Sequence, residues 1–174
     1  APCHRGRFAG RAAAVLHDEK IGLTGPTQGG PLANRTLRKD AEQLSPLWNT
    51  DRAPGRAPVR ATGALGHFLC LDGFGTPSDE EKAAGWPTHG EASKQEWETV
   101  RYGPATLKLS TRLPLAQEAV TRTMTLLHGE NVVYVNTEVE NLLAIDRPVY
   151  WAAHGTWGPP FLMPCETRTS IPPG

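Results

Sequence analysis

Alternation of apolar and polar residues in the second half of the chain limits the possible fold more than any other feature. In residues 105–113, ATLKLSTRL, Leu107, Leu109 and Leu113 share one face, and Lys108 and Arg112 share the other. Successive side chains of a β-strand point to opposite faces, so this pattern predicts a half-buried strand. Residues 119–127 and 131–140 alternate in the same way and predict two further strands.

Short connections between these segments favour antiparallel pairing. Residues 128–131, HGEN, carry the Gly and Asn expected of a tight hairpin, and residues 147–154, RPVYWAAH, predict a fourth strand that ends on His154. With 18 Gly and 16 Pro among its 174 residues, the chain favours many short strands over long helices. We therefore predict an all-β fold, an antiparallel β-sandwich formed by residues 1–174 as a single domain.

The first half of the chain shows weaker patterns. Residues 11–17 predict a strand, and GHFLCLDGFG (66–75) predicts a buried strand in which His67 is a core histidine. Residues 18–66 predict mostly short strands and loops. Residues 77–85 predict a short helix capped by Ser78, in which the acidic residues 79–81 complement the helix dipole and are not catalytic acids.

Charge and cysteine content exclude several classes of protein. Lys plus Arg and Asp plus Glu both number 18, so no basic surface for nucleic acid is expected. The apolar runs are too short for a membrane span, and the first ten residues do not resemble a secretory signal. Three widely separated cysteines (Cys3, Cys70 and Cys165) argue against a disulfide framework and favour the reducing cytoplasm.

The six histidines show no spacing typical of a metal site. No two lie at i, i+2 on a strand or at i, i+4 on a helix, so we predict no metal and no cofactor. His128 falls at the predicted hairpin tip and is expected to be exposed. His89 and His154 remain as candidates for chemistry.

These two histidines lie in segments rich in Gly, Pro and Trp. His89 precedes Gly90, which would let a substrate approach the backbone, and His154 ends a strand and precedes GTWGPPFL. Aromatic faces pack on the apolar faces of pyranose rings, and Trp97 and Trp157 lie beside these two motifs. The alternative is that the tryptophans fill the core of the sandwich.

Other catalytic signatures are absent or ambiguous in the sequence. It contains no G-x-S-x-G motif. Asp72, Glu91 and Glu96 could supply a hydrolytic carboxylate pair, but the sequence fixes no separation between them. Arg122, on an otherwise apolar strand face, either points into a cleft or is a paired structural arginine.

Three stretches together resemble the aldose 1-epimerase, or galactose mutarotase-like, superfamily. They read GHFLCLDGFGTPSDEEKAAGWPTHGEA, TRTMTLLHGENVVYVNTEVEN and RPVYWAAHGTWGPPFL, and the likeness covers about residues 60–164. The resemblance implies an antiparallel sandwich that binds a sugar and interconverts its anomers by acid–base catalysis. It implies that His154 is the catalytic acid, because histidine exchanges protons near neutrality, and that His89 binds substrate.

The same resemblance gives the remaining expectations. Substrate contacts are expected from Gly90, Trp97, Trp157 and Arg122 as well, and the partner is a small aldose. The family's general base is a glutamate expected beyond Gly174, so the domain is expected to be partial and poorly soluble alone. Lys94 is the cation nearest the His-Gly pair, whereas the hexose-phosphate branch carries an arginine there. Two alternatives are a non-catalytic carbohydrate-binding domain and a polysaccharide lyase or hydrolase on the same sandwich.

Overall fold

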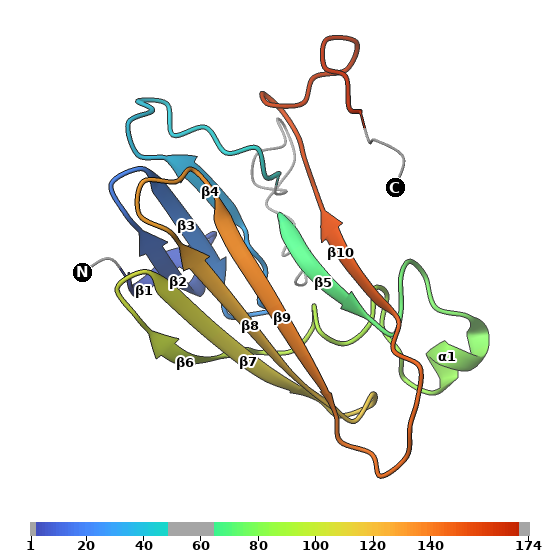
Figure 1. The fold of residues 1–174 in the computed structure, drawn as a ribbon. Helices are drawn as coiled ribbons and strands as arrows, with labels where there is room; N and C mark the ends of the chain where they lie inside the picture. The colour runs from blue at the N-terminus through green and yellow to red at the C-terminus, as the bar shows by residue number, and fades with distance from the viewer. Residues whose placement is uncertain (1–2, 49–64, 171–174) are drawn as a thin grey trace.

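Four strands at the start of the chain form the first sheet. The computed structural model describes residues 3–48 and 65–170. β1 (Cys3–Phe8), β2 (Arg11–His17), β3 (Ile21–Pro26) and β4 (Asn34–Leu37) each pair antiparallel with the next (Figure 1). Ala9 and Gly10 connect β1 to β2 with φ of 48° and 78°, the left-handed conformations that a two-residue hairpin turn requires.

The second sheet contains the strands that the alternation predicts. Its order is β6 (Glu98–Tyr102), β7 (Thr106–Leu113), β8 (Glu118–Leu126) and β9 (Val133–Asn141), and all neighbours are antiparallel. Leu107, Leu109 and Leu113 of β7 are buried, as their shared face predicts. In Figure 1 this sheet lies in front of the first, so the two sheets form the layers of a sandwich.

A third sheet, of two strands, extends the first layer. β5 (His67–Leu71) and β10 (Trp151–Gly155) pair antiparallel, and an isolated bridge between Leu32 and His67 connects β5 to the segment before β4. The two backbone hydrogen bonds of this bridge measure 2.8 and 2.9 Å. α1 (Asp79–Ala83) follows β5 and begins with the predicted Ser78 cap, completed to a capping box by Glu81.

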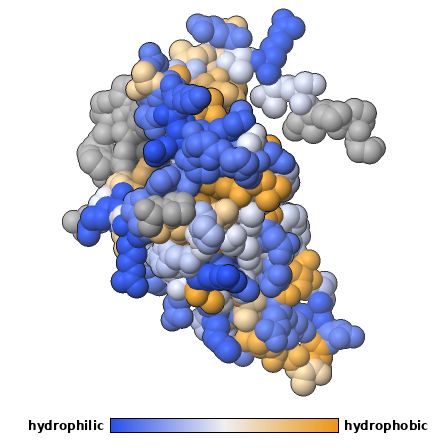
Figure 2. Space-filling model, turned by 60° about the vertical axis from the view of Figure 1, so that its left-hand side comes forward, coloured by the Kyte–Doolittle hydropathy of each residue, from blue (hydrophilic) through white to orange (hydrophobic). Residues whose placement is uncertain are grey.

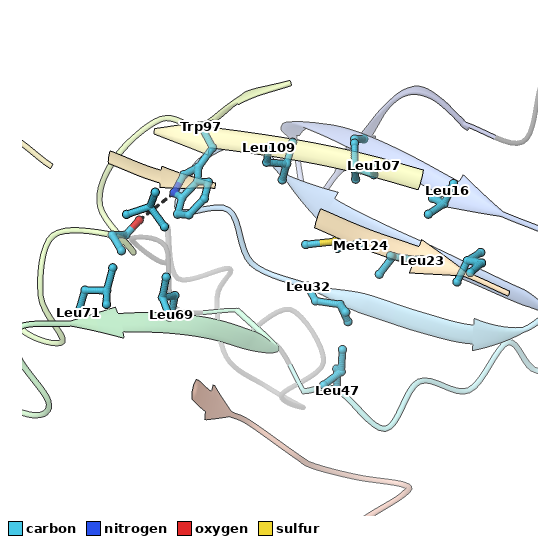
Figure 3. Close-up of a cluster of buried hydrophobic side chains, with 14 of the residues drawn as sticks. Leu16, Leu23, Leu32, Leu47, Leu69, Leu71, Trp97, Leu107, Leu109 and Met124 are labelled. Carbon is cyan, nitrogen blue, oxygen red and sulfur yellow. Dashed lines mark hydrogen bonds between the residues drawn. The ribbon is translucent and has the colours of Figure 1, made fainter. Parts of the chain in front are cut away.

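The hydrophobic core fills the space between the layers. Leu16 and Leu23 from the first sheet, Leu69 and Leu71 from β5, and residues of the second sheet contribute to it, as the close-up in Figure 3 shows. Trp97, only 1% exposed, lies in this core and donates its indole N–H to the carbonyl of Ala92 at 2.9 Å. The fold is therefore all-β and antiparallel, as predicted.

The structure also differs from the expected elements. The expected strand 147–154 begins only at Trp151, and neither β1 nor β6 was expected. β3 and β4 fall within the stretch 18–66, where short strands were predicted, but residues 49–64 lie outside the described part of the chain. Phe74, expected in a buried strand, is 53% exposed in the loop after β5.

Exposed apolar residues gather on the connection between β9 and β10. Leu142, Leu143 and Ile145 are 37%, 39% and 68% exposed. This connection forms the lower end of the molecule in Figure 1, and Figure 2 shows hydrophobic surface at the same end.

Across the residues that the structure describes, no helix has the length and apolar character needed to cross a membrane.

Replacing the core tryptophan tests this assignment. We expect Trp97→Ala to lower the free energy of unfolding by about 3–5 kcal/mol, because it removes a large buried ring and leaves a cavity. Trp157→Ala is the matched control: Trp157 is 51% exposed, and its loss is expected to cost about 1 kcal/mol or less. Urea denaturation measures both values, and equal costs would contradict the placement of Trp97 in the core.

Candidate functional site

The pairing of β5 with β10 places His154 beside two residues from the first half of the chain. His154 lies opposite Phe68, and Cys70 lies opposite Ala152, so Phe68, Cys70 and His154 share one face of the pair. The ring centroids of His154 and Phe68 are 4.5 Å apart in an edge-on arrangement. Leu69 and Leu71 have the opposite parity and point into the core (Figure 3). His154 therefore lies on the outer face of the first layer.

A loop after α1 brings His89 to the same face. Gly90 forms an isolated parallel bridge with Leu71 at the end of β5, which holds the loop against the strand. His89 and Gly90 both have positive φ, 67° and 74°. The centroids of the His89 and His154 rings lie 5.0 Å apart with an interplanar angle of 31°. The structure thus brings together the two histidines that the sequence singled out.

Gly90 is required by the packing of the loop against β5. A Cβ at this position would lie 2.0 Å from the carbonyl oxygen of Leu71, far inside van der Waals contact. The sequence-based interpretation, that Gly90 leaves room for a substrate, is therefore replaced by a structural one. The residue still acts on the site, because the close contact determines where His89 lies.

Two phenylalanines surround the histidine pair. Phe68, 1% exposed, and Phe74 each make edge-on contacts with both imidazoles, with centroid distances between 4.5 and 5.6 Å. Such contacts restrict the rotation of the rings and exclude water from part of their surface. The pair therefore has a defined orientation and remains only partly buried.

The hydrogen bond of His89 determines which ring nitrogen carries the proton. The backbone N–H of Gly75 donates to His89 Nδ1 at 3.2 Å, so the neutral ring is protonated at Nε2. Burial lowers the pKa of His89, and the nearby His154 and Lys94 lower it further. His89 is therefore neutral at pH 7 and offers Nε2–H as a hydrogen-bond donor.

Cys70 lies next to the two histidines, although no spacing in the sequence pointed to this grouping. One potential ligand atom from each of Cys70, His89 and His154 lies within 4.8 Å of those of the other two. Cys70 is fully buried, and burial raises the pKa of its thiol to about 11. The alternation within β5 was the available signal, because it places Cys70 and Phe68 on the same face.

Glu91 anchors the loop that carries His89. Its side chain is buried, and its Oε2 accepts the backbone N–H of Ala116 at 2.8 Å in the turn between β7 and β8. Glu118 is buried as well, and burial, followed by the charge of Glu91, raises the pKa of Glu118. Glu91 therefore faces the interior and has a structural role, which the sequence did not reveal.

Trp97 and Arg122 do not share the face of the histidine pair. Trp97 belongs to the core, so its ring is not available to a sugar, and the expectation of a substrate contact is corrected. Arg122 is 1% exposed and donates from Nη1 to the carbonyl of Gly30 at 2.7 Å. Its Nη2 lies 3.3 Å from Nδ1 of His67, a residue with the inward parity of β5. Burial lowers the pKa of Arg122 to about 10.

Trp157 and Arg122 line a cavity of about 500 Å³. His67, Leu69 and Val133 also contribute to its wall, so it lies between β9 and the inner face of the β5–β10 pair. The six candidate residues are therefore divided between two places. His89, Gly90 and His154 form the outer site, whereas Trp97, Arg122 and Trp157 lie in the core or around the inner cavity.

Comparison with solved structures identifies the fold. A proposed mutarotase, YeaD from Salmonella typhimurium, matches with a TM-score of 0.51 and 17% identity, over 71% of this chain and 42% of that chain. A galactose mutarotase-like protein from Lactobacillus casei ATCC 334 matches with a TM-score of 0.54 and 12% identity, over 74% of this chain and 44% of that chain. No family model matches the sequence, and a search of curated proteins found no match.

These two likenesses define the fold at low sequence identity. The chain has a galactose mutarotase-like fold, as its resemblance to that superfamily predicted, and it spans less than half the length of either structure.

Substitution of Gly90 tests the contact between the loop and β5. We expect Gly90→Ala to cost about 2–5 kcal/mol of stability, since a Cβ adds a clash with Leu71 to the strain of a positive φ. Gly10→Ala is the matched control: Gly10 also has a positive φ, 78°, but its added Cβ would meet no atom within 4 Å. Its cost should be about 1–2 kcal/mol. If urea denaturation gives the same loss of free energy of unfolding for both substitutions, the contact between Gly90 and Leu71 is contradicted.

The pKa of His67 predicts a pH dependence of stability. Burial, followed by the charge of Arg122, lowers this pKa below 6.5. Below about pH 6.5 the unfolded chain binds a proton that folded His67 does not, so stability falls as the pH decreases through this window. We expect His67→Gln to reduce the loss of stability between about pH 7.5 and pH 5.5.

Urea midpoints across that pH range measure the effect. His89 acts in the same direction, so the difference between the wild type and His67→Gln is the informative quantity. His128→Gln, which removes an exposed histidine that contacts Glu19 at the hairpin tip, serves as the reference for the loss of any histidine. A wild-type slope in His67→Gln would show that His67 does not carry the effect.

Proposed function

We propose that the histidine pair binds an aldose and takes part in the interconversion of its anomers. The observation that carries the proposal is the pair itself: two imidazoles 5.0 Å apart, enclosed by Phe68 and Phe74, on the outer face of a mutarotase-like sandwich. The similar structures support this assignment through the fold, and one of them is described as a proposed mutarotase.

In this proposal the two histidines have different roles. His154 is the general acid that protonates the ring oxygen when the pyranose opens, and histidine suits this step because its ordinary pKa lies near neutrality. His89 binds the substrate by donating a hydrogen bond from Nε2–H, the proton position that the Gly75 N–H fixes. Gly90 contributes through the position of the loop. A general base, which the resemblance expects to be a glutamate, takes the proton of the anomeric hydroxyl in the same step. The proposal thus assigns the acid and one substrate contact to residues of the described site.

A non-catalytic carbohydrate-binding domain is the second candidate. Among the residues that the structure describes, the group whose potential ligand atoms all lie within 4.8 Å of one another contains the two imidazoles and a thiol of high pKa, and no carboxylate belongs to it. A site with donors and no base could bind a sugar without opening it. Calorimetric titration that detects aldose binding without turnover would favour this candidate.

The three cysteines agree with the proposed cytoplasmic location. Cys3, Cys70 and Cys165 are all free thiols. Free thiols persist in reducing compartments, so we propose that the protein acts in the cytoplasm.

Polarimetry tests the proposed activity. We expect the full-length protein, with its general base, to accelerate the change in optical rotation of fresh α-D-glucose or α-D-galactose, and His154→Ala to reduce the rate by about 100-fold or more. His128→Ala is the control and should keep full activity, since His128 is exposed at the hairpin between β8 and β9. Absence of acceleration with every common aldose would reject the catalytic proposal.

A further inference from the structure

We propose that Cys70, His89 and His154 also form a binding site for a divalent transition-metal ion of the zinc class. One thiol and two imidazoles from three segments of the chain place their potential ligand atoms within 4.8 Å of one another. Thiolate sulfur and imidazole nitrogen are the donors that Zn²⁺ and its chemical relatives prefer. This inference concerns the donor atoms alone and does not depend on the sugar chemistry.

The three donor atoms lie close enough to bind one ion after small movements. Ordinary Zn–N and Zn–S bonds hold neighbouring ligand atoms about 3.3–3.6 Å apart, so inward movements of about 1 Å complete the site. Cys70 and His154 are diagonal neighbours on paired strands, and the Gly90–Leu71 bridge holds His89 against the end of β5. Three protein ligands leave a fourth position for water or another small ligand.

The present contacts of the donors agree with this assignment. His154 Nδ1 is shielded from solvent and has no hydrogen-bond partner, which is uncommon for a buried ring nitrogen. Cys70 is a free, buried thiol. His89 Nδ1 accepts one long hydrogen bond, 3.2 Å from the Gly75 nitrogen, and the ring gives up this bond when it turns to bind a metal. The two imidazoles therefore lose little by coordination, whereas Cys70 must release its thiol proton, which its raised pKa opposes.

Lys94 is the charged group that opposes a bound cation. Its ammonium interacts electrostatically with both Cys70 and His89. A divalent ion at the three donors would be repelled by this charge, although the thiolate formed on binding would offset part of the repulsion. Removal of the Lys94 charge is therefore expected to tighten metal binding.

Cobalt absorbance provides a direct measurement. Cys3 and Cys165 lie outside the site, so Cys3→Ser and Cys165→Ser remove them as competing thiols and define the background protein. Titration of this protein with Co²⁺ should give intense visible bands of a tetrahedral ion and a near-ultraviolet thiolate-to-cobalt charge-transfer band. Both should saturate at one ion per chain, and Zn²⁺ should abolish them by displacement.

Variants in the same background identify the ligands. Cys70→Ser should remove the charge-transfer band. Cys70→Ser and His154→Ala should each weaken Co²⁺ binding by roughly 10- to 100-fold or more, because loss of a residue that only supports a metal ligand already has an effect of that size. His128→Ala should bind as the background protein does. Lys94→Met should bind more tightly, and unchanged or weaker binding would overturn the placement of the ion beside Lys94. Near-ultraviolet circular dichroism confirms that each variant is folded.

Two results would overturn the proposal. One is the absence of a thiolate-to-cobalt band in the background protein, and the other is equal Co²⁺ affinity of the Cys70→Ser variant. The readout is the spectrum of the metal, so it does not require sugar turnover. If the polarimetric activity is confirmed, Zn²⁺ should inhibit it, because the ion and the sugar would compete for the same imidazoles.

Discussion

The antiparallel pairing of β5 with β10 is the interaction on which the candidate site depends. It aligns His154 with Phe68 and joins segments that are about 80 residues apart along the chain. Polar contacts secure the end of the pair: Asp72 N–H donates to the carbonyl of Tyr150, and Tyr150 N–H donates to Asp72 Oδ1. Arg147 forms an ion pair with the same carboxylate. Without this register neither Cys70 nor His89 would lie near His154.

Alternate side chains of β5 point to opposite faces, so one set packs in the core and the other lies at the candidate site. His67, Leu69 and Leu71 face the interior, where Leu69 and Leu71 join the core and His67 lies next to Arg122. Phe68 and Cys70 face the histidine pair. The inner side belongs to the apolar core, whereas the outer side packs against the two imidazoles. Five consecutive residues therefore contribute both to the core and to the proposed site.

The strands could be predicted from the sequence wherever one face is buried and the other is solvated. β7 and β8 satisfied this condition, and their alternation indicated both their type and their inward residues. β1 could not be predicted in this way, because its burial does not alternate and none of its residues is fully buried. β9 also has no fully buried residue, yet its alternating valines predicted it, so the missing signal in β1 is the alternation of its sequence, CHRGRF.

The site was predictable only in part, because it depends on contacts between distant segments. The motifs around His89 and His154 indicated both histidines, but no spacing could show that Cys70 joins them. Trp97 was predicted to contact substrate because it follows the His-Gly motif closely in the sequence. Its ring instead packs against Gly30 between the layers. Arg122 has the parity of Val120 and Met124, which agrees with its buried position.

The two-residue period of β5 also determines which genetic changes the protein can tolerate. Substitutions at Leu69 or Leu71 can alter the packing between the layers and leave the outer donors in place, and conservative substitutions at Cys70 can alter the donors and leave the cluster between the layers in place. An insertion or deletion of one residue within β5 acts differently, since it moves every following side chain to the opposite face. Leucines would then face the imidazoles, and the thiol would enter the core. Point mutations can thus change the two properties separately, whereas a change of length would disturb both at once.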